Sequence, residues 1–219
     1  MIIVLFGKPG GGKGTQAPLL AAALDVPTLA TGDELRAAVR DGTPMGRAAK
    51  AAMERGELVP DPVILGILKD ALSRPRFARG AVLDGVVRTE PQAVGLSAML
   101  AELGRTLDAV LYFDVPDDVL VDRLGGRTVC ERCQTPYQGR EPGTRCDKAD
   151  GGVLVRRKDD EPEAVRHRLA VYERDTAPVL AWYRQAGTKV ARVDAVGSVT
   201  EVTARALRAL GLDRQGGGA

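Results

Sequence analysis

A glycine-rich segment near the start of the chain carries the residue types that bind phosphate. Residues 7–15 read Gly-Lys-Pro-Gly-Gly-Gly-Lys-Gly-Thr, directly after an apolar run and before an amphipathic stretch. Glycines let backbone N–H groups turn toward an anion, and the N-terminus of a following helix adds a partial positive charge. Lys13 can then reach the outer phosphates, and Thr15 can serve the shell of a magnesium ion. The strict pattern would place Ser or Thr at position 14, where this chain has Gly14.

Three cysteines form a second group with chemical potential. Cys130, Cys133 and Cys146 are the only cysteines and lie within one short segment. An odd number argues against a disulfide framework, whereas a Cys-x-x-Cys pair followed by a third cysteine is typical of a zinc knuckle. The alternative is a segment that has lost its metal and keeps reduced thiols.

Composition restricts the classes of protein that could use these residues. The chain has 219 residues, 44% hydrophobic and 27% charged, with a formal net charge of +2. These values exclude a disordered chain and argue against a broadly basic nucleic-acid binder. No run approaches the ~18 apolar residues of a membrane span, and the start of the chain lacks the features of a signal peptide. We therefore expect a cytoplasmic protein with no membrane or nucleic-acid partner.

Short apolar runs alternate with helical patterns along the chain. Five runs predict strands, at 2–6, 27–30, 81–84, 108–115 and 189–194. Amphipathic patterns predict helices, at 13–24, 32–41, 44–55, 61–73, 91–103, 116–125, 161–185 and 198–210. Nearly continuous apolar strands between helices indicate a parallel sheet covered on both faces, and ligands then bind at the carboxyl ends of the strands.

Two segments interrupt this alternation and are expected to project from the core. Residues 31–59 hold two helices between the second and third strands, which is more than one crossover needs. Residues 126–160 are polar, contain the cysteines and show no helical period.

The phosphate-loop variant, which continues into Gln16, resembles that of adenylate kinases, a branch of the nucleoside monophosphate kinases. The resemblance continues through further motifs over about residues 1–212, at 31–36, 84–89, 114–116, 157–160 and 168–169. It implies an α/β P-loop three-layer fold with a five-stranded parallel sheet. It also implies a core of residues 1–30, 60–125 and 161–219, a helical insert (31–59) that binds the monophosphate, and a lid (126–160).

The same resemblance implies reversible, magnesium-dependent transfer of a phosphoryl group, ATP + AMP = 2 ADP, in a monomeric enzyme. Catalytic roles fall on Lys13, Arg88, Arg127, Arg157 and Arg168. ATP binding falls on Gly10, Gly11, Gly12, Lys13, Gly14, Thr15, Arg123, Arg127, Pro136, Tyr137 and Gly197. AMP binding falls on Thr31, Arg36, Glu57, Leu58, Val59, Gly85, Val86, Val87, Arg88, Gln92, Arg157 and Arg168.

These residue types suit the transfer of a phosphoryl group. The reaction needs alignment and neutralisation of charge on the equatorial oxygens, and the planar fork of arginine bonds two oxygens at once. Asp84 ends a buried strand, where an unpaired carboxylate is expensive, and is expected in the water shell of magnesium. Asp33 is a weaker candidate for that shell, or a helix N-cap.

One departure from the family pattern concerns the acceptor site. The family usually reads Asp-Gly-Phe-Pro-Arg-Thr, whereas this chain has Val86 and Val87 in place of Phe and Pro. The change removes a fixed torsion and an aromatic surface, which leaves base affinity open. The resemblance implies that Thr31 and Gln92 meet the adenine base and carry the preference for AMP, since a buried polar group left unpaired rejects a competing base.

The helix expected from residue 161 offers an internal check on the predicted site. Apolar positions from Val165 to Tyr183 mark one buried face. Asp160 and Glu163 resemble a capping box at its start. Arg168 borders the buried face and can reach the site, whereas His167 points away to solvent.

Zinc is expected to close the lid. In the family two residues separate the third cysteine from the fourth ligand, and the corresponding position is Ala149 here, so Asp150 is expected as the ligand ahead of Asp147. Such a closed site is structural. Movement of the helical insert and lid would exclude water from the reaction.

Two alternatives remain at this stage. Val86 and Val87 make a kinase for another monophosphate, such as UMP or CMP, conceivable. A zinc-ribbon binding module that uses nucleotide only as a switch is less favoured, because aromatic residues for base stacking make up only 4% of the chain.

Overall fold

The apolar runs of the sequence form a central parallel sheet. The computed structural model describes residues 1–55, 57–148 and 151–212. The strands are β1 (Ile2–Phe6), β2 (Thr28–Ala30), β3 (Ala81–Asp84), β4 (Ala109–Asp114) and β8 (Val190–Asp194). They pair in the order β2-β3-β1-β4-β8, with Ile2 opposite Ala81 and Ile3 opposite Ala109. The five-stranded parallel sheet is therefore confirmed.

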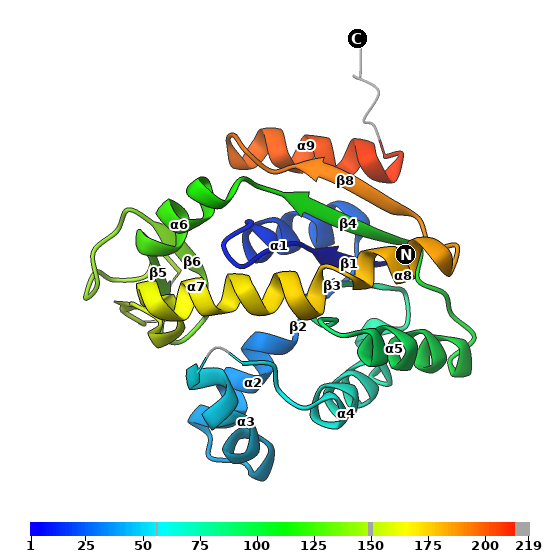
Figure 1. The fold of residues 1–219 in the computed structure, drawn as a ribbon, viewed down its shortest axis with the longest axis horizontal. Helices are drawn as coiled ribbons and strands as arrows, with labels where there is room; N and C mark the ends of the chain where they lie inside the picture. Colours follow the sequence, from blue (N-terminus) through cyan, green and yellow to red (C-terminus); the bar gives the residue numbers. More distant parts are fainter. Residues whose placement is uncertain (56, 149–150, 213–219) are drawn as a thin grey trace.

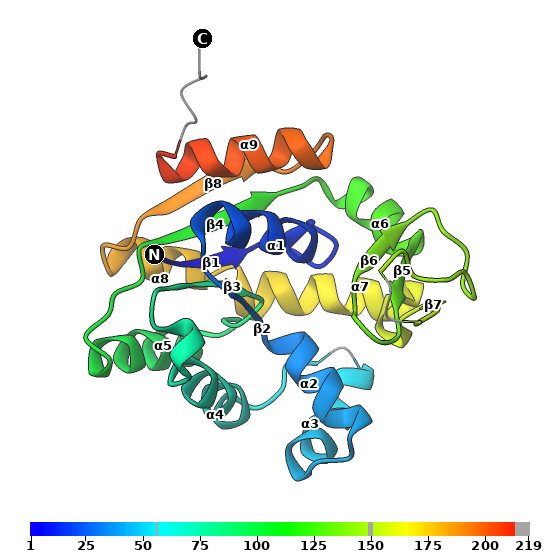
Figure 2. The ribbon, with the colours of Figure 1, turned by 180° about the vertical axis from the view of Figure 1, so that it is seen from behind.

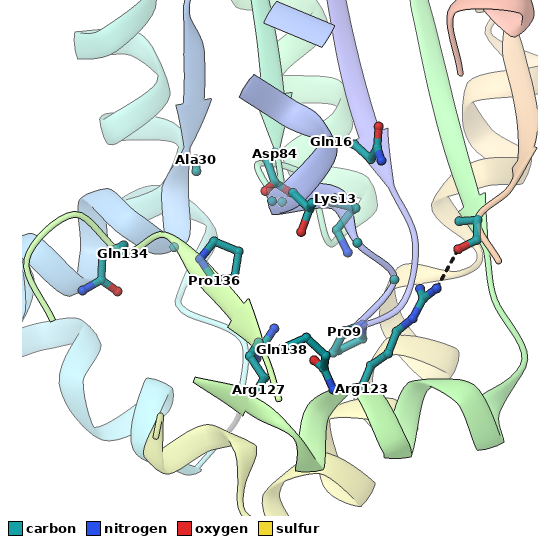
Figure 3. Close-up of a pocket in the computed structure, with 18 of the residues that line it drawn as sticks. Pro9, Lys13, Gln16, Ala30, Asp84, Arg123, Arg127, Gln134, Pro136 and Gln138 are labelled. Atoms are coloured by element: carbon teal, nitrogen blue, oxygen red, sulfur yellow. Dashed lines mark hydrogen bonds between the residues drawn. The ribbon is translucent and has the colours of Figure 1, made fainter. Parts of the chain in front are cut away.

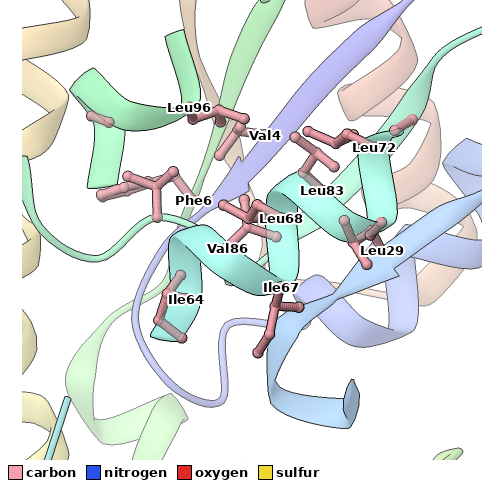
Figure 4. Close-up of a cluster of buried hydrophobic side chains, with 14 of the residues drawn as sticks. Val4, Phe6, Leu29, Ile64, Ile67, Leu68, Leu72, Leu83, Val86 and Leu96 are labelled. Carbon is pink, nitrogen blue, oxygen red and sulfur yellow. The ribbon is translucent and has the colours of Figure 1, made fainter. Parts of the chain in front are cut away.

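The central strand β1 is apolar along its whole length because both of its faces are buried. Side chains alternate between the faces of a strand. Ile2, Val4 and Phe6 join the core on one side of the sheet, whereas Ile3 and Leu5 join the core on the other. Figure 4 shows Val4 and Phe6 in the first of these cores, among side chains from β2, β3, α4 and α5.

Helices cover both faces of the sheet. They are α1 (Lys13–Leu24), α2 (Thr31–Arg40), α3 (Pro44–Arg55), α4 (Asp61–Leu72), α5 (Glu90–Glu102), α6 (Asp117–Gly125), α7 (Pro162–Val171), α8 (Val179–Gln185) and α9 (Val199–Leu210). Buried side chains place α1 and α9 on one face and α4, α5 and α8 on the other (Figures 1 and 2). Within the described ranges, no helix is both long and apolar enough to cross a membrane.

The helix expected over 161–185 is divided in the structure. Helix α7 ends at Val171, a π-helical turn follows at Tyr172–Thr176, and α8 begins at Val179. The N–H of Ala177 donates to the carbonyl of Tyr172, five residues back. Pro178 follows and has no N–H to continue the α-helical ladder, and π-turns commonly accommodate such breaks. Thr176 and Tyr183 are buried as expected, and His167 is exposed.

The predicted capping box at Asp160 is wrong. The N-cap of α7 is Glu161, which makes no side-chain capping bond. Asp160 belongs instead to a 3₁₀ turn, Lys158–Asp160, and its carboxylate pairs with two arginines described below. Tertiary ion pairs have outweighed the local capping preference.

The two interrupting segments project from the core. Helices α2 and α3 lie below the sheet in Figure 1, and a small antiparallel sheet lies beyond α6. That sheet consists of β5 (Arg127–Cys130), β6 (Pro136–Gln138) and β7 (Leu154–Val155), in the order β6-β5-β7. These strands were not predicted, because they are too short to show an alternating pattern.

Candidate active site

The glycine-rich loop between β1 and α1 wraps around a lysine ammonium. Lys13 Nζ donates to the carbonyl oxygens of Gly7 (2.6 Å) and Lys8 (3.0 Å) within its own loop. Gly12 is the N-cap of α1 with φ +88°, a left-handed conformation that disfavours other residues. At Gly10, with φ +82°, a Cβ would lie 2.9 Å from Leu124 Cγ. Both glycines are therefore required by the turn, which leaves the start of α1 open to an anion.

A large cavity of about 550 Å³ opens above this loop. It lies at the carboxyl ends of β1 and β3 and is bounded by the lid strand β6 (Figure 3). Every residue predicted to bind ATP lines it, from the phosphate loop, α6, the lid and the loop after β8: Gly10, Gly11, Gly12, Lys13, Gly14, Thr15, Arg123, Arg127, Pro136, Tyr137 and Gly197. Arg123 crosses toward β8, where its Nη2 donates to the carbonyl of Ala195 at 2.9 Å.

A second cavity of about 200 Å³ lies between the helical insert and the core. Most residues predicted to bind AMP line it: Thr31, Arg36, Glu57, Leu58, Val59, Gly85, Arg88, Gln92 and Arg168. Arg157 lines the large cavity instead. Arg36, Arg88 and Arg168 line both cavities, so the two spaces adjoin at three guanidinium groups.

The arginines at this junction gather on the walls of the two cavities. Burial, together with neighbouring guanidinium groups, lowers the pKa of Arg88 and of Arg157 to about 10. Burial, with Arg88, Arg168 and Arg127 adding to it, lowers the pKa of Lys13 to about 8, although Asp84 opposes the shift. Arg157 Nε is buried without a hydrogen-bond partner among the described residues. Such a cluster of cations with an unsatisfied donor fits a polyanion such as a nucleotide phosphate chain.

Two acidic residues hold the arginines in place. Asp160 is only 4% exposed at its side chain and accepts hydrogen bonds from Arg127 Nε at 2.7 Å and Arg168 Nη1 at 3.2 Å. Asp159 also pairs with Arg168; burial opposes ionisation there, but the surrounding arginines lower its pKa. The sequence predicts neither role, although both residues belong to the motif at 157–160.

Two further carboxylates lie near the phosphate loop. Asp84, at the end of β3, lines the large cavity, and burial raises its pKa, with Asp33 adding to the effect and Lys13 opposing it. Asp33 lies within the first turn of α2 and pairs with Arg36, whereas the N-cap is Ala30, so the N-cap alternative for Asp33 is wrong. Two carboxylates lining a phosphate cavity fit the oxygen-rich surroundings of a hydrated magnesium ion.

The polar groups expected to meet a base are already ordered by the protein. Gln92 Oε1 accepts from the N–H of Arg88 (2.7 Å), and its Nε2 donates to Asp61 Oδ1 (2.7 Å). Thr31 Oγ1 donates to the carbonyl of Gly85 at 2.9 Å. Each side chain can make further hydrogen bonds, since an amide offers four hydrogen-bonding positions and a hydroxyl offers three. Asp61, which also accepts from Thr89 Oγ1, was not predicted.

Val86 and Val87, which replace the Phe and Pro of the family pattern, pack into the hydrophobic core. Both side chains are buried among apolar residues, and neither lines either of the two cavities. Val87 lines a smaller third cavity of about 80 Å³ beside Lys13 and Arg88, whereas Val86 does not.

The three cysteines gather at the tip of the lid. All three Sγ atoms lie within 4.8 Å of one another, and those of Cys133 and Cys146 are 3.7 Å apart. Hydrogen bonds from Tyr137 OH and from the N–H of Lys148, with the neighbouring thiols, lower the pKa of the Cys146 thiol. Three converging thiols of this kind fit zinc. Asp150, the predicted fourth ligand, lies outside the described residues, and Asp147 Oδ1 accepts from Arg140.

Fold and site together define a class of protein. A phosphate loop between the central strand and its helix, beside a cluster of arginines that line the same cavity, belongs to a P-loop phosphotransferase.

Comparison with known proteins agrees with this class. Residues 5–188 match the profile of the family described as Adenylate kinase. A protein named Adenylate kinase from Gemmatimonas aurantiaca is 62% identical over 96% of this chain and 99% of its own length. Proteins of the same name from Acidothermus cellulolyticus (47%; 96% and 98% covered) and Methanothrix thermoacetophila (45%; 92% and 94% covered) are also similar. The chain belongs to the adenylate kinase family.

Proposed function

We propose that this enzyme transfers a phosphoryl group between ATP and AMP, giving two molecules of ADP reversibly. The observation that carries the proposal is the pair of adjoining cavities that share Arg36, Arg88 and Arg168. A donor in the large cavity and an acceptor in the small one would meet end to end at these cations. That arrangement is what in-line transfer requires.

The donor side depends on the phosphate loop. Backbone N–H groups of residues 10–15 would hold the β- and γ-phosphates, with Lys13 on the outer oxygens and Thr15 near the metal. Arg123 would lie beside the adenine, and Gly197, Pro136 and Tyr137 would border it. Arg127 and Arg157, from the lid, would neutralise the transferring group.

The acceptor side depends on the helical insert and the loop after β3. Arg36 and Arg88 would grip the AMP phosphate, while the carbon skeletons of residues 57–59 and the backbone of 85–87 border the base. Thr31 and Gln92 would read the base with the hydrogen-bonding positions they retain. Because Asp61 and the Arg88 N–H orient the Gln92 amide, a base with the wrong pattern would leave a buried polar group unpaired.

Two metals belong to this proposal. Magnesium bound with ATP would neutralise charge on the phosphates, with Asp84 and, less directly, Asp33 holding its water shell. Zinc would be structural, held by Cys130, Cys133, Cys146 and Asp150. The active unit would be a monomer.

The helical insert (31–59) and the lid (126–160) would act as covers on the core. When they meet over both substrates they would exclude water, so that ATP is not hydrolysed in place of transfer. No general base of the kind used by a hydrolase is needed.

A panel of acceptors tests the proposal. With ATP and magnesium, turnover should be highest for AMP and at least about tenfold lower for CMP, UMP and GMP, because each mismatched base leaves a polar group unpaired. Equal or better turnover of another monophosphate would favour the alternative kinase. Lys13→Ala should abolish transfer while leaving the fold intact by circular dichroism, and retained activity would contradict the phosphate-loop assignment.

A further inference from the structure

Gln134, in the lid, has a backbone conformation that glutamine rarely adopts. Its φ is +59°, and among the described residues only Asp25 is another non-glycine residue with positive φ. Asp25 is the C-cap of α1, a position where a short polar residue tolerates this conformation. Gln134 is not at a helix end, and a glycine would remove the strain. Strain of this kind persists where the surroundings hold it, often at a functional site.

The side chain of Gln134 is held in place by the turn between the first two cysteines. Its Nε2 donates to the carbonyl oxygens of Cys130 (3.3 Å) and Glu131 (3.1 Å). Its own N–H donates to the Cys130 carbonyl at 3.0 Å. With both donors engaged by the backbone, the amide Oε1 has a fixed direction.

That oxygen meets an arginine from the helical insert. Arg36 Nε donates to Gln134 Oε1 at 3.1 Å, across 98 positions of sequence. A second nitrogen of the same guanidinium, Nη2, pairs with the carboxylate of Asp33. Gln134 lines the large cavity and lies on the lid loop before Pro136 and Gln138 (Figure 3).

We propose that Gln134 is a positioning residue that orients the Arg36 guanidinium toward the acceptor phosphate. The inference rests on the proposed function, because it takes Arg36 as a ligand of that phosphate. A guanidinium held at two nitrogens loses less freedom when it binds an anion.

Steady-state kinetics of three variants tests the role of the amide. Gln134→Ala removes the amide and keeps the backbone strain, whereas Gln134→Gly removes both. Both should raise KM for AMP by about three- to tenfold, the loss expected for one hydrogen bond to a charged group. KM for ATP and kcat should stay within about twofold, because binding that is equal in ground and transition states changes KM alone. Gln185→Ala, an exposed glutamine at the end of α8, is the matched control and should leave all three constants unchanged.

Thermal unfolding of the same proteins separates positioning from stability. Gln134→Gly should have a higher midpoint than Gln134→Ala, because only glycine relieves the positive φ, although the two share the weakened AMP binding. The inference would be overturned if KM for AMP correlated with the thermal midpoint instead. In that case Gln134→Gly would bind AMP about as well as the unaltered protein, and the amide would have no role.

A double-mutant cycle identifies the partner. Arg36→Ala alone should raise KM for AMP, and adding Gln134→Ala should change it by less than about twofold, since the interaction is already lost. An unchanged KM for AMP in Arg36→Ala would overturn the assignment of Arg36 in the proposed function. Two outcomes would overturn this inference alone. In one, Arg36→Ala raises KM for AMP strongly and Gln134→Ala does not change it. In the other, Gln134→Ala raises KM for AMP as much in the Arg36→Ala background as in the unaltered protein.

Discussion

Lys13 is the residue whose protonation is most sensitive to the site around it. Burial and the nearby arginines lower its pKa to about 8, against about 10.4 for an exposed lysine. The charged form is therefore disfavoured in the folded protein. This cost to stability is fully present below about pH 8 and is relieved as the pH rises toward 10.4, where the folded state loses its proton before the unfolded state does.

Binding of ATP should reverse this shift. Phosphate oxygens beside Lys13 favour the ammonium form, so ATP binding at pH 8.5 should take up protons, about half a proton or more per site if the pKa rises above 10. Calorimetry in two buffers of different ionisation enthalpy measures the uptake. The variant Lys13→Arg, whose guanidinium stays charged, is the control and should show none. Binding without proton uptake in the unaltered enzyme would contradict the lowered pKa.

Asp160 shows how strongly one buried carboxylate can organise a cationic site. It joins Arg127 of β5 to Arg168 of α7. Asp160→Asn keeps the shape but removes the charge, which leaves two guanidinium groups to repel each other. We expect kcat to fall about ten- to hundredfold and the free energy of unfolding to fall by about 3 kcal/mol.

The control for that variant is Asp175→Asn, at a surface pair with Arg174. It should change the free energy of unfolding by less than about 1 kcal/mol, since surface pairs contribute little. Urea unfolding and steady-state assays of both variants supply the comparison. If Asp160→Asn retains kcat within a factor of two, the carboxylate does not position the arginines for catalysis.

At the scale of elements, the lid is built on a very small sheet. Its sheet consists of strands of four, three and two residues, which is little structure for hydrogen bonding alone to stabilise. The cysteine cluster lies where a metal would cross-link the turn after β5 to the segment before β7.

Removal of the metal should therefore destabilise the protein. Treatment with a chelator should release one zinc per chain and lower the thermal midpoint by several degrees, at roughly 2–4 °C per kcal/mol for a chain of this size. Cys133→Ser should have a lower midpoint from the outset and should respond little to the chelator. Elemental analysis that finds no zinc in protein purified without chelator would contradict the assignment.

The elements that the sequence predicted are those with strong local patterns. The five apolar runs, the phosphate loop and the amphipathic helices each have periodicity or residue types that act within a few positions. The lid strands and the π-turn at Tyr172 lack such a pattern, since a two-residue strand has no period and a π-turn depends on what surrounds Pro178. The same reasoning applies to the site: phosphate-binding residues stand in motifs, whereas Asp61, Gln134 and Asp160 act through partners distant in sequence.

At the scale of the whole molecule, stability depends on the two cores that sandwich the sheet. Leu68 of α4 is fully buried against the strands (Figure 4). Leu68→Ala should lower the free energy of unfolding by about 2–5 kcal/mol, through lost burial and the cavity left behind. Leu19→Ala on α1, where the side chain is 41% exposed, should change it by less than about 0.5 kcal/mol. Chemical denaturation of both variants measures the difference, and equal effects would contradict the two-core description.

The lid is inserted into the chain between α6 and α7, and the helical insert between β2 and α4. For a flexible segment the entropy of closing a loop grows only with the logarithm of its length, and each doubling costs about 0.6 kcal/mol. Segments attached in this way can lengthen, shorten or be exchanged with little effect on the stability of the sheet beneath them. The core, the helical insert and the lid can therefore change in sequence and length independently during evolution. An engineer could replace the lid while keeping the core.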